Sequence, residues 1–331
     1  MPSAGPGASS AAAAPEDVEV VRPRPSWRRT AVSVALAVVL VAAFGYAIAG
    51  RWSEVVQRLR EQQPAVVIGA LALCLAATVL SFLIWRGALA VLGSPRPARQ
   101  LARMFFVAQL GKYLPGSVWP VLAQMRMGRE IGLPRQRVGL AFLLTLGLSV
   151  LWGLVVGLLA VPALLDREGP AIALTVLLAV PVLLVLLVPR VLNAVLARAL
   201  RVLRRPGLEA PFAARDVLRA SLWTLVFWVV YGAHVWLLAV GLGADPWRSL
   251  PVAIGGFAVA FSVGPLLVVL PAGAGVREAV LVVVLSTVLS RTDATAVALT
   301  SRGLLMATDG LLAVTGWLLP RGHAGDPRSL P

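Results

Sequence analysis

Five charged side chains lie within otherwise apolar stretches of the sequence: Lys112, Arg277, Glu278, Arg302 and Asp309. An ionisable group in such surroundings is costly and is a candidate functional residue by default. The three cations are suited to an anionic group, because a guanidinium binds phosphate in bidentate fashion and an ammonium binds it as a point charge. The two carboxylates are the only candidates for a general base.

Lys112 is the only lysine in the chain, beside 29 arginines. It lies in residues 111–119 (GKYLPGSVW), between residues that break helices. One interpretation is that its ammonium, assisted by free backbone N–H groups at helix ends, holds an anionic headgroup. The other is that its side chain extends to the headgroups of the cytoplasmic leaflet. The sequence leaves both interpretations open.

Arg277 and Glu278 follow a Pro- and Gly-rich segment, residues 270–275 (LPAGAG), which is expected to end one helix and precede another. Glu278 would lie in the first turn, where a carboxylate favours the helix dipole. Arg277 is then either an interfacial arginine or a ligand of a lipid phosphate. Arg302 and Asp309 share one helix face but are separated by about 10 Å of rise, so each is expected to meet another helix or a wet cavity.

These residues must be positioned by membrane helices. The chain of 331 residues is 59% hydrophobic and 14% charged, far more apolar than a soluble domain. The fold class is therefore all-α, a polytopic integral membrane protein, since about 20 apolar residues suffice to cross the bilayer. Six clear spans are predicted over residues 30–50, 64–85, 138–165, 169–189, 220–244 and 294–319.

Two further apolar regions are interrupted. Residues 104–125 are flanked by arginine-rich segments on both sides, which predicts that both ends are cytoplasmic. Together with Gly111, Pro115, Gly116 and Pro120, this favours a broken, re-entrant hairpin, which is tolerated where it is buried in protein or lines a wet cavity. Residues 249–290 contain either two full spans or a second re-entrant hairpin.

The order of these elements suggests an internal repeat. Residues 64–165 and 220–319 both consist of a span, a broken segment and a span, with the breaks opening to opposite sides. Such an inverted-topology repeat places discontinuous helices at a transporter's binding site. Domain boundaries follow: a disordered cytoplasmic tail over 1–26, a membrane domain over 27–320 and a polar tail over 321–331.

Composition excludes several functions. The net charge of +15 is spread over short gaps between apolar runs, where it sets orientation, so nucleic-acid binding is disfavoured. Cys74 is the only cysteine, and His234 and His323 are far apart, so no disulfide framework, metal site or cofactor is expected. His234 is interpreted as a satisfied packing residue. The first span is expected to be retained rather than cleaved as a signal peptide, because it is too long for a signal core.

Residues 111–119 and 270–279 (LPAGAGVREA) resemble two motifs of one family, the lysylphosphatidylglycerol synthetase transmembrane or flippase-like domain. The resemblance covers about residues 30–320 and implies transbilayer movement of a phospholipid in a bacterial membrane. It adds Tyr113, Pro115, Gly116 and Trp119 to the candidate substrate-binding residues. No aminoacyl transferase domain follows residue 319, so synthesis of the lipid by this chain is not expected.

The leading hypothesis is translocation of an anionic or polyprenyl-linked lipid across the inner or plasma membrane, with both termini cytoplasmic. No catalytic residue is assigned, and an enzyme is less expected. One alternative is a membrane-embedded glycosyl or acyl transferase acting on a lipid-linked substrate, with Glu278 or Asp309 as base. Another is a non-catalytic subunit that serves a separately encoded transferase.

Overall fold

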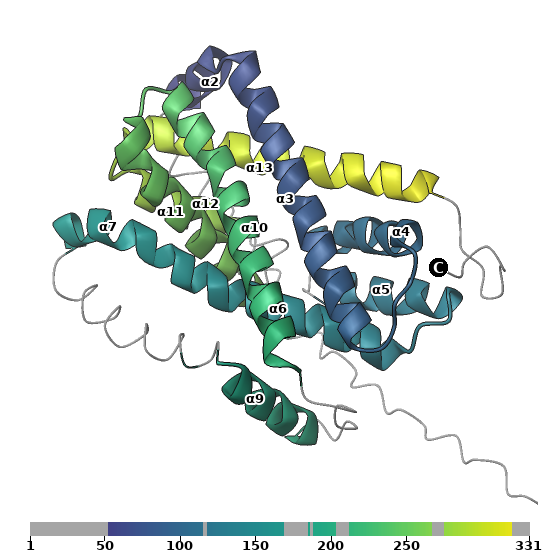
Figure 1. Ribbon diagram of the computed structural model, residues 1–331. Helices are drawn as coiled ribbons and strands as arrows, with labels where there is room; N and C mark the ends of the chain where they lie inside the picture. The colour runs from purple at the N-terminus through teal and green to yellow at the C-terminus, as the bar shows by residue number, and fades with distance from the viewer. Residues whose placement is uncertain are drawn as a thin grey trace, which may run out of the picture.

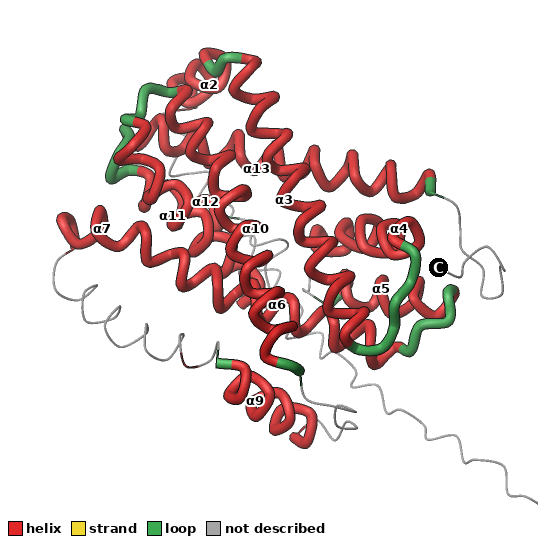
Figure 2. The backbone as a smooth tube through the Cα atoms, in the orientation of Figure 1, coloured by secondary structure: helices red, strands yellow, loops and turns green. Residues whose placement is uncertain are grey.

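The computed structural model describes residues 52–114, 118–168, 188–202, 212–266 and 275–319, together with Val185. Every regular element in these ranges is helical, which confirms the predicted all-α class (Figure 2). The helices are α2 (Trp52–Glu61), α3 (Pro64–Val91), α4 (Ala98–Gln109), η1 (Leu110–Tyr113), α5 (Trp119–Glu130), α6 (Arg135–Gly157), η2 (Leu158–Ala160), α7 (Val161–Glu168), α9 (Pro189–Val202), α10 (Ala214–Gly241), α11 (Pro246–Leu266), α12 (Val276–Leu285) and α13 (Arg291–Leu318).

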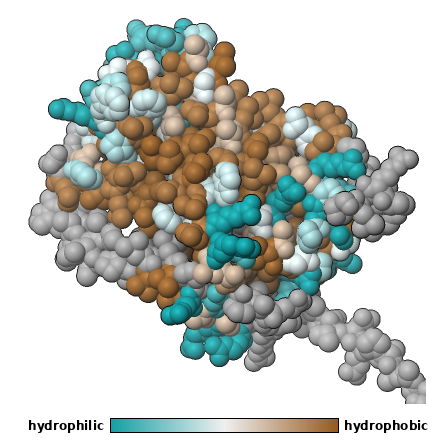
Figure 3. Space-filling view, viewed as in Figure 1, coloured by the Kyte–Doolittle hydropathy of each residue, from teal (hydrophilic) through white to brown (hydrophobic). Residues whose placement is uncertain are grey.

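Within the described residues, five helical stretches are long and apolar enough to cross a membrane: Pro64–Val91, Arg135–Leu165, Ala214–Gly241, Pro246–Gly264 and Arg291–Leu318. Four coincide with predicted clear spans, and the fifth belongs to the irregular region over 249–290. The predicted spans over 30–50 and 169–189 lie outside the described residues, apart from the end of the second, and so do the two predicted tails. Apolar side chains cover much of the face seen in Figure 3, around a hydrophilic patch near its centre, and such an apolar surface is expected in contact with lipid.

The first broken region is a helical hairpin formed by α4 and α5, which pack against each other (Figure 1). The α4 helix gives way to the short 3-10 helix η1 at Leu110, and α5 begins at Trp119. Gly111 permits this turn, because a Cβ there would lie 3.0 Å from backbone atoms of Trp119 and Pro120. Each arm has 12 residues, or about 18 Å, and cannot cross about 30 Å of hydrocarbon.

The second broken region is also a hairpin, with α11 and α12 packed side by side. The 10 residues of α12 reach only about 15 Å, so this arm does not span. The sequence left two full spans open for residues 249–290, and the short second arm favours the hairpin. The arms pack closely, since a Cβ at Gly256 would lie 2.6 Å from the Val284 side chain.

Both hairpins lie against α13, which they approach from opposite ends (Figure 1). Near the end of α13, the Arg103 guanidinium of α4 donates to the carbonyls of Trp317 and Leu319 at 2.5 and 2.7 Å. At the other end, α12 is followed after five residues by the start of α13. A helix, a hairpin and a second helix thus follow one another twice along the chain. The two hairpins approach α13 from opposite ends, as an inverted repeat requires, and both tips reach the middle of α13.

Candidate functional site

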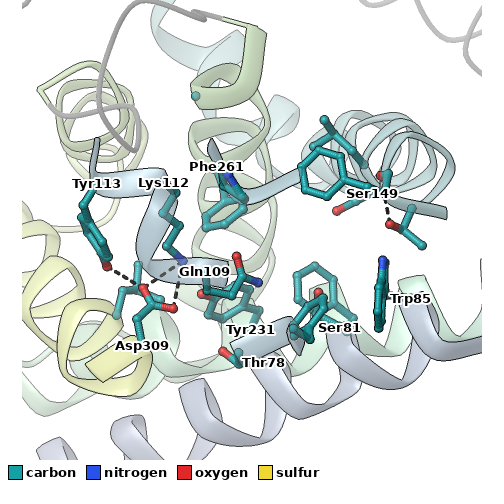
Figure 4. A pocket seen from close by; sticks show the side chains of 18 of the residues that line it. Thr78, Ser81, Trp85, Gln109, Lys112, Tyr113, Ser149, Tyr231, Phe261 and Asp309 are labelled. Atoms are coloured by element: carbon teal, nitrogen blue, oxygen red, sulfur yellow. Dashed lines mark hydrogen bonds and ion pairs between the residues drawn. The ribbon is translucent and has the colours of Figure 1, made fainter. Parts of the chain in front are cut away.

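A cavity of about 240 Å³ lies where the two hairpin tips meet α13 (Figure 4). It is enclosed by side chains from α3, α4, η1, α5, α6, α10, α11, α12 and α13. The lining residues are Thr78, Ser81, Trp85, Phe105, Gln109, Lys112, Tyr113, Pro120, Gln124, Phe142, Thr145, Leu146, Ser149, Phe227, Tyr231, Phe261, Gly264, Arg277, Arg302, Leu305 and Asp309. Charged groups gather at one end of the cavity and neutral polar groups extend to the other.

The tip of the first hairpin is bound to α13 through Asp309. The Lys112 ammonium lies 2.9 and 2.8 Å from the two carboxylate oxygens, and the Tyr113 hydroxyl donates to Oδ2 at 2.5 Å. The Lys112 side chain is 27% exposed and that of Asp309 only 4%. The ammonium therefore points toward a buried carboxylate of the protein, which favours an internal role of Lys112 over the surface-anchor interpretation.

The tip of the second hairpin carries a matching cluster around Glu278. Its Oε2 accepts the Gly275 backbone N–H at 2.7 Å, and its Oε1 accepts from Arg277 at 3.0 Å and from Arg302 at 3.4 Å. Gly275 has a φ of 84°, a left-handed conformation open to glycine, so the end of the glycine-rich segment sets the start of α12. The predicted cap by Glu278 is confirmed, and the same carboxylate also binds α13.

Arg302 connects the two clusters. Its guanidinium carbon lies 6.0 Å from the centre of the Tyr113 ring, within the range of a cation–π contact. Arg302 and Asp309 do not pair with each other but with residues of other elements, as their separation along α13 predicted. Among the described residues, three cations and two carboxylates give the site a formal charge of +1.

The predicted site residues are only partly brought together. Lys112, Tyr113, Arg277, Arg302 and Asp309 line the cavity, and Glu278 holds two of these cations without lining it. Trp119 is 45% exposed and is not among the cavity residues, so its binding role stays a prediction. Pro115 and Gly116 lie outside the described residues.

Sequence reasoning missed the neutral polar residues of the cavity. Thr78, Ser81 and Trp85 follow one face of α3 at intervals of three and four residues, and Thr145 and Ser149 do the same on α6. This spacing of polar side chains within apolar spans was the available signal. His234, by contrast, packs as predicted, because its ring contacts the Tyr231 carbonyl and the Ser301 hydroxyl and is fully buried.

A second hollow of about 480 Å³ lies between α3, α6 and α10. Its lining includes the exposed residues Arg86 and Arg219 beside apolar side chains. Thr145 of α6 lines both this groove and the central cavity. The two hollows are therefore neighbours across α6, with basic residues on the outer one.

Fold and site define an integral, multi-pass membrane protein with a charged cavity between two helical hairpins. The chain belongs to the lysylphosphatidylglycerol synthase TM region family, whose model matches residues 30–313. This confirms the resemblance seen in the motifs, and the match includes both hairpins and all charged residues of the site. The family associates the chain with membrane lipids. Comparison with curated proteins found no match.

Proposed function

We propose that this protein translocates a lipid with an anionic headgroup across the membrane. The observation that carries the proposal is the convergence of Lys112, Arg277 and Arg302 on one cavity at the tips of two hairpins. The tips enter from opposite sides of the membrane domain, so a headgroup bound between them is near midplane. Discontinuous helices in matching halves are typical of transporter binding sites.

In this proposal the headgroup phosphate replaces the carboxylates as the partner of the three cations. Asp309 holds Lys112, and Glu278 holds both arginines. An incoming phosphate offers strong, bidentate acceptors for the guanidinium groups and a counter-charge for the ammonium. The groove beside Arg86 and Arg219 supports a lateral route by which the acyl chains remain in lipid while the headgroup reaches the cavity.

The geometry supports a carrier more than a transferase. A general base needs a free carboxylate aimed at its substrate. Asp309 accepts from Lys112 and Tyr113, while Glu278 is bound by two arginines and a backbone N–H. Carboxylates held in this way serve as counter-charges. A role as partner of a separately encoded transferase is compatible with the same site and is tested by co-purification.

The test is lipid movement in proteoliposomes, followed with a fluorescent anionic phospholipid and a membrane-impermeant quencher. We expect Lys112→Met and Arg277→Gln to slow the movement at least tenfold. The matched control is Arg248→Gln, which removes an exposed cation from the first turn of α11. Normal movement in both site variants, with correctly folded protein, would refute the assignment of these residues.

Binding can be measured separately because Lys112 is the only lysine. An amine-reactive reagent labels this side chain and the N-terminus alone, and mass spectrometry of peptides separates the two. We expect an anionic lipid to protect Lys112 from labelling, whereas a zwitterionic lipid gives no protection. Equal labelling with both lipids would show that the headgroup does not reach the hairpin tip.

A further inference from the structure

The cavity also contains hydrogen-bonding groups that have no partner among the described residues. The Trp85 indole Nε1 and the Gln124 Oε1 are buried and make no hydrogen bond within the described residues. Both residues are 1% exposed, and both line the cavity. A buried polar atom without a partner is destabilising, so native proteins retain few of them without a functional reason.

The side chains that lead from Trp85 toward the ion pair are uncharged. Ser81 and Thr78 of α3 and Gln109 of α4 lie between Trp85 and the Lys112–Asp309 pair (Figure 4). The nearby Thr145 hydroxyl donates to the Ala141 carbonyl of its own helix at 2.8 Å. Its remaining lone pairs are then acceptors. Beside its charged groups, the cavity lining thus offers an indole N–H donor, an amide carbonyl acceptor and hydroxyl acceptors.

This set of groups discriminates between classes of headgroup. An acyl chain would leave Trp85 and Gln124 without hydrogen bonds. An ammonium group would find no carboxylate among the neutral lining residues, because Asp309 belongs to the charged end of the cavity. Hydroxyl groups fit, because a hydroxyl can accept from the indole N–H or donate to the amide oxygen, and a polyol carries several of them.

We propose that Trp85 and Gln124 form a second subsite, which binds an uncharged polyol such as a sugar or cyclitol, joined to the phosphate held by Lys112 and the arginines. This inference rests on the proposed function, since the charged end must bind the phosphate of the same lipid. It narrows the cargo from any anionic lipid to one whose phosphodiester carries a hydroxyl-rich, uncharged group.

The experiment compares two lipids in nanodiscs with equal acyl chains: phosphatidylinositol and phosphatidylmethanol. Both carry one phosphodiester charge, and they differ in the polyol. Binding is measured by protection of Lys112 from amine labelling. The wild-type protein is expected to bind phosphatidylinositol at least tenfold more tightly, since a site built for hydroxyl groups discriminates against the analogue without them.

Two conservative variants test the subsite. Trp85→Phe keeps the aromatic contact with Phe105, whose ring centre lies 5.4 Å away, and removes the N–H. Gln124→Met keeps the length and flexibility of the side chain and removes the amide. Each is expected to weaken phosphatidylinositol binding about tenfold and to leave phosphatidylmethanol binding unchanged. A wild-type preference that both variants retain, or no preference at all, would overturn the inference.

The remaining arms separate this inference from the proposed function. Because Lys112 reports on binding through its labelling, it cannot itself be mutated, and Arg277→Gln serves as the variant of the charged end. This variant should weaken the binding of both lipids equally. If neither lipid protects Lys112 in the wild-type protein, the proposed function fails first. Soluble inositol 1-phosphate tests whether the ligand must be a lipid. If it protects Lys112 from labelling as well as phosphatidylinositol does, the assignment to a lipid is overturned.

Discussion

The ion pair between Lys112 and Asp309 is expected to couple the first hairpin to α13 by about 2 kcal/mol. At 2.8 Å the Coulomb attraction is about 6 kcal/mol at an effective dielectric constant of about 20 and about 1.5 kcal/mol in bulk water. The ammonium is partly exposed and the carboxylate is not, so the net coupling lies between these limits after the cost of desolvation.

The variants Lys112→Met, Asp309→Asn and their combination form a double-mutant cycle. Lys112→Met leaves the buried carboxylate without its counter-charge and should lower the free energy of unfolding by about 3 kcal/mol. Asp309→Asn should cost less, about 1.5 kcal/mol, because the freed ammonium can be hydrated and the amide still accepts from Tyr113. The double variant should be less destabilised than the sum of the two.

The assay is reversible unfolding in mixed micelles with increasing denaturing detergent, followed by tryptophan fluorescence. The control cycle uses Arg58→Met and Glu61→Gln, an exposed pair 2.9 Å apart on α2, which should couple by no more than about 0.5 kcal/mol. The reasoning is refuted if the double variant is destabilised by the sum of the two single changes in unfolding free energy, within about 0.5 kcal/mol. In that case the ion pair does not hold the hairpin.

Three further predictions concern the rest of the membrane domain. Glu278→Gln should lower the free energy of unfolding by about 3 kcal/mol in the same titration, because two guanidinium groups lose their counter-charge. Gly232→Ala should destabilise the protein by at least 1 kcal/mol, since the added Cβ would lie 2.5 Å from the Ile254 backbone. Gly147→Ala is the control and should not destabilise the protein, because a Cβ there would have nothing within 4 Å. In a Cys74→Ala background, an impermeant maleimide should label Arg96→Cys only from the cytoplasmic side and Asp245→Cys only from the opposite side; labelling of both from one side contradicts the topology.

Much of the fold could be predicted from the sequence because apolar length, arginine position and helix breakers act locally. The break after Gln109 follows from the Gly and Pro residues of 111–120, and re-entry follows from arginines on both flanks. Region 249–290 stayed ambiguous, because α11 alone is long enough to span and only the short α12 shows that the second arm turns back.

The candidate site was predicted in part for a similar reason. A charge in an apolar run is conspicuous, so Lys112, Arg277 and Asp309 could be identified from the sequence. Which cation meets which carboxylate depends on how far each hairpin reaches along α13 and on the rotation of that helix, and neither is encoded locally.

The neutral half of the cavity is harder to find from the sequence. Thr78 donates to the Cys74 carbonyl of its own helix at 2.9 Å, as hydroxyl residues commonly do in membrane helices. The sequence alone does not distinguish such a residue from other hydroxyl residues of membrane helices, and only the packing shows that it faces a cavity. Trp85 likewise reads as a core or interfacial aromatic, and only the unpartnered nitrogen distinguishes it.

Charge balance explains why the ion pairs of the site suit the proposed carrier function. With three cations and two carboxylates, a headgroup of charge −1 makes the site neutral, whereas an uncharged headgroup leaves one charge uncompensated. Because each cation already has a carboxylate partner, a phosphate gains only the difference between two sets of contacts. Affinity is thereby kept moderate, and re-formation of the Lys112–Asp309 and Arg277–Glu278 pairs favours release. A permanently bound structural lipid would gain nothing from such competition, whereas a transported lipid must both enter and leave.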